Sequence, residues 1–134
     1  MASAIYDNAK TLFISTGLNL SSLTIKCLLI DTDDYSFSAA HEDLADVVAS
    51  SRVGTAQTLT GKTVSGGVFD ATDITFSSLT GDQVEALILY YDSGASATST
   101  LIAYIDSATG LPLTPSGSDA TIQWDSGANK IFAF

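Results

Sequence analysis

Three aspartates stand close together at Asp31, Asp33 and Asp34, in the arrangement of this chain that most resembles a metal-binding motif. Carboxylates at alternate positions can face one hard cation, as they do in calcium-binding loops. The calcium-loop pattern is incomplete, because Ser36 stands where that loop requires a glycine. Aspartate is also common in turns, where its carboxylate accepts hydrogen bonds from the local backbone. We therefore predict no bound metal, with Asp31, Asp33 and Asp34 as the weak candidates for one.

The other residues that could do chemistry form no catalytic motif. His41 is the single histidine and precedes Glu42, but adjacent side chains do not face each other in a helix or a strand. A zinc site or a nucleophilic triad would need further ligands or partners around that histidine. The turn at residues 61–63 (GKT) fails the phosphate-loop spacing, since Ala56 occupies the place of the first glycine. The sequence therefore predicts a protein that is not an enzyme and has no cofactor.

The charge balance argues against two classes of partner. Fifteen acidic residues stand against five basic ones, for a net charge of -10 at pH 7. Binding to nucleic acid or to an anionic membrane depends on clustered basic residues. The five basic residues here are scattered along the chain: Lys10, Lys26, Arg52, Lys62 and Lys130. We therefore predict no direct contact with nucleic acid and no membrane partner.

The chain also lacks the sequence signals of export. No apolar run approaches the roughly 18 residues that a membrane-spanning helix needs. The first residues have neither the basic nor the long apolar region of a signal peptide. Cys27 is the single cysteine, so there is no disulfide framework, and its apolar neighbours predict a buried, unreactive thiol. We expect a protein that is made and kept in a cytoplasm.

Two segments have the spacing of apolar residues that predicts a helix. In residues 1–16, Ser3 can cap the helix and Gly17 can end it. Residues 43–48 form a second, shorter helical patch. The apolar stripe of the first segment consists of Ile5, Ala9, Leu12 and Phe13, and that of the second of Leu44, Val47 and Val48.

The rest of the chain has the pattern of strands separated by Gly- and Ser-rich turns. Residues 86–91 and 101–105 are apolar on both faces, which predicts a central hairpin covered on both sides. Residues 74–76 alternate as a strand with one wet face, and residues 121–124 and 130–134 predict a second hairpin around a five-residue loop. We predict one β-rich domain over residues 1–134, folded as a β-sandwich or a barrel-like sheet with the two short helical additions.

Several stretches resemble a family of small structural proteins of tailed-bacteriophage virions. They are the opening 1–7 (MASAIYD), the strand and turn 27–35 (CLLIDTDDY), the segment 59–64 (LTGKTV) and, most specifically, 101–112 (LIAYIDSATGLP) and 124–132 (WDSGANKIF). The resemblance covers nearly the whole chain without a large gap. The chain departs from the pattern in being more acidic and in ending with Ala133 and Phe134. The family has no catalytic motif, so no functional residue can be transferred.

The resemblance implies a decoration or cement protein, which binds the outside of an assembled capsid in the infected bacterium. Its implied partners are the major capsid protein and further copies of itself. A neck, tail-tube or baseplate component is the main alternative, and a carbohydrate- or receptor-binding module is another. Termini can change partner without disturbing a core, so we expect the chain to fold without residues 1–6. The interface candidates are the apolar residues Ile5, Tyr6, Leu12 and Phe13.

Overall fold

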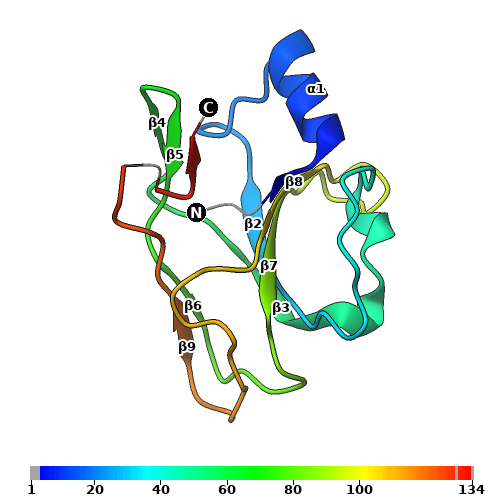
Figure 1. The fold of residues 1–134 in the computed structure, drawn as a ribbon, viewed down its shortest axis with the longest axis vertical. Helices are drawn as coiled ribbons and strands as arrows, with labels where there is room; N and C mark the ends of the chain where they lie inside the picture. Colours follow the sequence, from blue (N-terminus) through cyan, green and yellow to red (C-terminus); the bar gives the residue numbers. More distant parts are fainter. Residues whose placement is uncertain (1–3, 129, 134) are drawn as a thin grey trace.

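The computed structural model describes residues 4–128 and 130–133 and has a mainly β fold, as predicted. One α-helix and two single-turn 3-10 helices accompany the strands (Figure 1). In chain order the elements are β1 (Ala4–Ile5), α1 (Asp7–Ser15), β2 (Ile25–Ile30), η1 (Leu44–Asp46), η2 (Ala49–Ser51), β3 (Arg52–Thr58), β4 (Thr63–Ser65), β5 (Val68–Asp70), β6 (Ile74–Phe76), β7 (Ala86–Tyr91), β8 (Leu101–Ile105), β9 (Ala120–Ile122) and β10 (Phe132–Ala133).

The largest sheet has five antiparallel strands in the order β1-β8-β7-β2-β3. Its centre is the β7–β8 hairpin, which confirms the prediction from the two-sided apolar pattern of these strands. Successive residues of a strand point to opposite faces of a sheet. In β7, Leu87 and Leu89 accordingly belong to one core cluster, whereas Ala86, Ile88 and Tyr90 belong to the other. The central strands are therefore buried on both sides.

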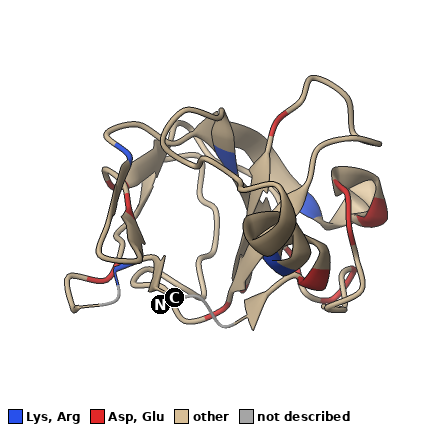
Figure 2. Cartoon of the chain, turned by 90° about the horizontal axis from the view of Figure 1, so that it is seen from above, with Lys and Arg blue, Asp and Glu red and all other residues tan. Residues whose placement is uncertain are grey.

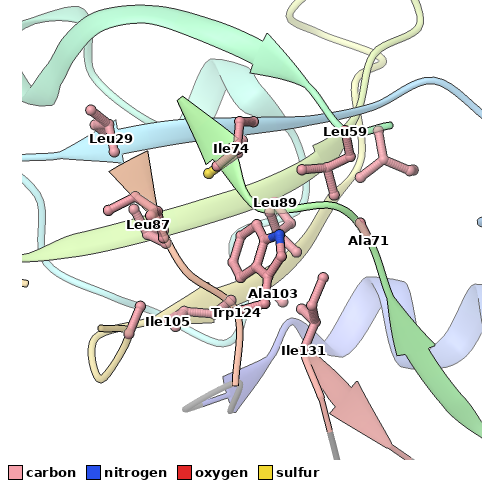
Figure 3. Close-up of a cluster of buried hydrophobic side chains, with 14 of the residues drawn as sticks. Leu29, Leu59, Ala71, Ile74, Leu87, Leu89, Ala103, Ile105, Trp124 and Ile131 are labelled. Carbon is pink, nitrogen blue, oxygen red and sulfur yellow. The ribbon is translucent and has the colours of Figure 1, made fainter. Parts of the chain in front are cut away.

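The main core lies between one face of the five-stranded sheet and two smaller sheets. These are β10-β5-β4 and β6-β9, and both are antiparallel. Figure 3 shows the packing: Leu87 and Leu89 face side chains from β6 and from the C-terminal part of the chain. Ile74 and Phe76 of β6 are buried while Thr75 is exposed, which confirms the predicted wet face. The two layers give the fold a sandwich-like arrangement.

The other face of the large sheet is covered by the N-terminal segment and by residues 31–51. Tyr6 and Ala9 pack there together with Tyr35 and Val47, and all four are buried. The side chain of Arg52 fastens this cover, because its guanidinium donates hydrogen bonds to the carbonyl oxygens of two residues in it, Leu44 and Val47. A charged donor strengthens such bonds. The cover is thus tied to the edge strand β3.

The predicted N-terminal helix begins later than expected. Ile5 lies in β1, where it pairs with Ala103 of β8, and α1 starts at Asp7 with Tyr6 as the preceding cap residue. Ser3, the predicted cap, lies outside the described residues. The predicted stop is confirmed, because Gly17 has a φ of 77° and its N–H donates to the carbonyl oxygen of Leu12.

Two other local predictions need correction. The patch at residues 43–48 does contain a short helical element, the 3-10 turn η1, but Val48 is exposed instead of sharing the buried face of Leu44 and Val47. The two C-terminal strands do not pair with each other. β9 pairs with β6 and β10 pairs with β5, so the predicted hairpin around residues 125–129 does not form.

Candidate functional site

The structure brings Asp31 and Asp33 together with Glu85, a residue that the sequence did not suggest. One carboxylate oxygen of each lies within 4.8 Å of those of the other two. Asp34, the third sequence candidate, is not part of this group. Glu85 directly precedes β7, and the antiparallel pairing of Ile30 with Ala86 places it beside the turn that follows β2. Glu85 could be identified only from this strand pairing. It accepts a hydrogen bond from Thr32, which lies 53 residues away in the sequence.

Hydrogen bonds of the turn explain how these carboxylates are held. The backbone N–H of Asp33 donates to Asp31 Oδ1, as in many aspartate turns. The backbone N–H and the hydroxyl of Thr32 both donate to Glu85 Oε1. Asp31 is buried, whereas Asp33 is exposed. These hydrogen bonds explain the three carboxylates as groups that link the turn after β2 to the start of β7. We therefore do not assign a metal site to them.

His41 lies in a cluster of aromatic rings and not beside a nucleophile. Among the described residues, its ring is hydrogen-bonded to the Tyr35 hydroxyl, with 2.8 Å between Tyr35 Oη and His41 Nδ1. The Tyr35 hydroxyl lies in turn 2.9 Å from that of Tyr6. Glu42, the neighbour considered as an acid–base partner, is exposed and donates its backbone N–H to Asp46. The position of His41 therefore supports a structural role.

The tyrosines of this cluster are held in their neutral form. Burial raises the pKa of Tyr6 well above its ordinary value, and the hydrogen bond to Tyr35 raises it further. Burial also raises the pKa of Tyr35 and of Tyr104, whose ring lies 6.3 Å from that of Tyr35. Phenols that stay protonated at neutral pH act here as hydrogen-bond donors and acceptors and not as bases.

The interface candidates of the N-terminal segment differ in exposure. Tyr6 is 0% exposed, so its prediction as a contact residue is wrong: its side chain is already used within the chain. Ile5, Leu12 and Phe13 are partly buried, and their role in an interface stays a prediction. The sequence pattern missed Ile14, although it is 88% exposed and lies on the same helix. The helical spacing could not identify Ile14, because Ile14 is not one of the residues of the apolar stripe.

An apolar hollow of about 150 Å³ opens beside α1. Phe13 lines it from the helix, and Val64, Val68 and Phe132 line it from the three-stranded sheet. Val64 is 54% exposed. The hollow lies toward the end of the molecule where α1 and the β4–β5 hairpin are found (Figure 1). This end therefore offers solvent-accessible apolar side chains from two separate elements.

A second hollow, of about 310 Å³, is lined mainly by hydroxyl and amide side chains. Its residues include Thr55, Gln57, Ser77 and Thr80. Carbohydrate sites usually add an aromatic face to such groups. Phe76, the ring in the lining, is only 1% exposed, so the hollow presents polar groups without that face.

The surface charge has no basic patch in the part of the chain that the structure describes. Figure 2 shows the Lys and Arg residues on separate elements, and the acidic residues spread between them. Lys10 is paired with Asp7, and Lys26 with Asp92. Within the described ranges, no helix is long and apolar enough to cross a membrane.

The chain matches no family model and no curated protein.

Proposed function

We propose that this protein is a non-enzymatic component of a phage virion that binds the outside of the capsid shell and stabilises it. The proposal rests on the resemblance of nearly the whole chain to small virion proteins. The structural observation that supports it most is the end of the molecule around α1. There the exposed Val64 lines an apolar hollow, and the exposed Ile14 follows Phe13, which also lines it. Exposed apolar groups that gather on one side are typical of contact surfaces.

The proposed partners are the major capsid protein and neighbouring copies of the chain. Such a protein needs a scaffold that keeps its shape while its surface makes repeated contacts. The central strands meet that need, since they are covered on both faces and leave binding to loops and edges. The net charge of -10 keeps unassembled copies apart in solution.

A binding assay with particles tests the contact surface. Particles assembled without the protein are mixed with purified chain, and the bound fraction is measured after sedimentation. Ile14→Asp and Val64→Asp should weaken binding by at least tenfold, because each places a charge in the proposed contact. Val48→Asp is the matched control, since Val48 is 50% exposed but lies outside both α1 and the three-stranded sheet that border the hollow. Equal binding by all three variants would remove the contact assignment.

The position and effect of the protein in the particle test the function itself. Particles without it should burst at a lower temperature than complete particles, and a particle map should show it on the shell. Density in the neck, tail tube or baseplate would replace the capsid assignment with that alternative. Binding to a glycan array, with no stabilisation of particles, would favour a receptor-binding module.

A further inference from the structure

Three side chains form a continuous hydrogen-bond chain from the interior towards the surface. The Tyr6 hydroxyl is bonded to the Tyr35 hydroxyl at 2.9 Å, and the Tyr35 hydroxyl to His41 Nδ1 at 2.8 Å. Tyr6 is 0% exposed and Tyr35 is 4% exposed, whereas His41 is partly exposed. In the part of the chain that the structure describes, Tyr35 is the hydrogen-bond partner of the Tyr6 hydroxyl. We call these three residues the Tyr–Tyr–His chain.

One direction of this chain gives both hydroxyl hydrogens an acceptor. With a neutral imidazole, the two hydroxyl hydrogens serve the two links: Tyr6 donates to Tyr35, and Tyr35 donates to His41 Nδ1. The imidazole hydrogen is then on Nε2, because Nδ1 accepts. Protonation of His41 places a third hydrogen on Nδ1, and both ring nitrogens become donors. Two links cannot hold three hydrogens, so among the described groups one hydroxyl hydrogen of Tyr6 or Tyr35 loses its acceptor.

The charged groups around the chain do not remove this surplus hydrogen. Asp46 of η1 faces His41, and the N–H groups of Glu42 and Asp43 lower the pKa of Asp46, so it is ionised there. Its attraction to a protonated imidazole is screened, because Asp46 is exposed. On the other side, Tyr104 of β8 faces Tyr35, and the acidic groups Asp106 and Glu85 face Tyr104. These carboxylates favour a positive charge, but the described hydrogen bonds of both buried hydroxyls run within the Tyr–Tyr–His chain.

Tyr6 is also the point at which the N-terminal segment is attached to the fold. Its backbone N–H donates to the carbonyl oxygen of Ile102, and its own carbonyl oxygen accepts the N–H of Lys10 in α1. On either side, Ala4 pairs with Tyr104 and the N–H of Asp7 donates to the carbonyl oxygen of Ala39. Loosening the Tyr6 side chain therefore loosens β1 and the start of α1 together.

We propose that the Tyr–Tyr–His chain is a pH-sensitive latch, which holds the N-terminal segment while His41 is neutral and weakens when His41 is protonated. Histidine is the side chain that commonly changes charge between about pH 5 and 8. When the latch opens, β1 leaves β8 and the backbone of Ala103 and Tyr104 becomes a free sheet edge. Such an edge can pair with a strand of another chain. This device does not depend on the proposed function.

The single histidine allows a direct spectroscopic test of the direction of the chain. The ¹⁵N chemical shifts of the imidazole at pH 8 should show the hydrogen on Nε2 and an accepting Nδ1. Hydrogen exchange of the Tyr6 amide then measures the latch, because this N–H is bonded to Ile102. After correction for intrinsic rates, protection at pH 5.5 should be about tenfold lower than at pH 7.5, or about 1.4 kcal/mol. The amide of Ile88 in β7 should not change.

Two variants separate the latch from general effects of acid. His41→Gln keeps an acceptor for Tyr35 but does not titrate, so the change in Tyr6 protection should disappear. Tyr35→Phe breaks both links and should lower protection equally at both pH values. The proposal is overturned by a hydrogen on Nδ1 at pH 8, by an unchanged Tyr6 amide in the wild type, or by an equal change in His41→Gln.

Discussion

Replacement of Tyr6 by alanine should destabilise the whole fold. Tyr6 is 0% exposed and packs in the cover of the five-stranded sheet. Truncation of a buried aromatic side chain to alanine typically costs about 3–5 kcal/mol. The free energy of unfolding expected for 134 residues is roughly 7–20 kcal/mol. This one change should therefore remove a large part of the stability. Removal of residues 1–6 also deletes β1 and should lower the stability further, and whether the shortened chain folds, as the sequence predicts, is read from the same unfolding curve.

Urea unfolding followed by the fluorescence of Trp124 measures this effect. Trp124 is the single tryptophan and is buried, so its emission reports loss of the core. With a slope of about 2 kcal/mol per molar urea, Tyr6→Ala should lower the midpoint by about 2 M. Tyr6→Phe keeps the ring and loses one hydrogen bond, which is worth about 0.5–1.5 kcal/mol. With the same slope, the urea midpoint of Tyr6→Phe should fall by less than about 1 M.

Ile14→Ala is the control on the exposed side of the same segment. Ile14 is 88% exposed, and substitutions at such positions usually change stability by less than about 0.5 kcal/mol. The reasoning is refuted if Tyr6→Ala unfolds at the same urea concentration as Tyr6→Phe, because the ring would then contribute nothing. It is also refuted if Ile14→Ala is as damaging as Tyr6→Ala.

Three further outcomes are expected. Ile88→Asp should prevent folding, since an unpaired charge at a fully buried site costs several kcal/mol, and a soluble variant with cooperative unfolding would show that the core is misplaced. Gly54→Ala should lower the urea midpoint more than Gly17→Ala: both glycines have positive φ, but only at Gly54 would a Cβ meet another side chain, Leu79, at 2.6 Å. Thermal melts with and without a chelator should coincide, as the incomplete ligand set around Asp31, Asp33 and Asp34 predicts, and a drop of many degrees in chelator would contradict this.

The strands at the centre of the fold could be predicted because a strand that is buried on both faces has a continuous apolar sequence. Residues 86–91 and 101–105 are apolar almost without interruption, and runs of this length are typical of strands that are covered on both sides. The polar segment between them is short enough for a hairpin. Local pattern and final pairing therefore agree for β7 and β8.

The C-terminal strands could not be paired from sequence, because their partners are distant. Two apolar runs around a Gly- and Ser-containing turn predict a hairpin wherever they occur. Here Ile122 pairs with Ile74, and Phe132 with Phe69. No local feature specifies these partners. The choice depends on which edges the rest of the fold leaves open.

The candidate sites show the same limit. Asp31 and Asp33 could be proposed from their spacing, whereas Glu85 joins them only through the register of β2 with β7. The apolar period of residues 5–13 correctly indicated α1 but included Ile5, which belongs to β1. The helical spacing of apolar residues does not show that the side chain of Tyr6, between β1 and α1, is buried in the core.

The antiparallel pairing of β1 with β8 has a consequence for how the chain folds during synthesis. Ala4 leaves the ribosome 100 residues (104 − 4) before its partner Tyr104. Phe132 of β10, which completes the three-stranded sheet, likewise follows its partner Phe69 by 63 residues (132 − 69). Pairings between distant segments form slowly, because the entropy cost of closing a long loop must be met before any stabilising contact forms. The nascent chain therefore carries β1 without its partner until β8 has been made.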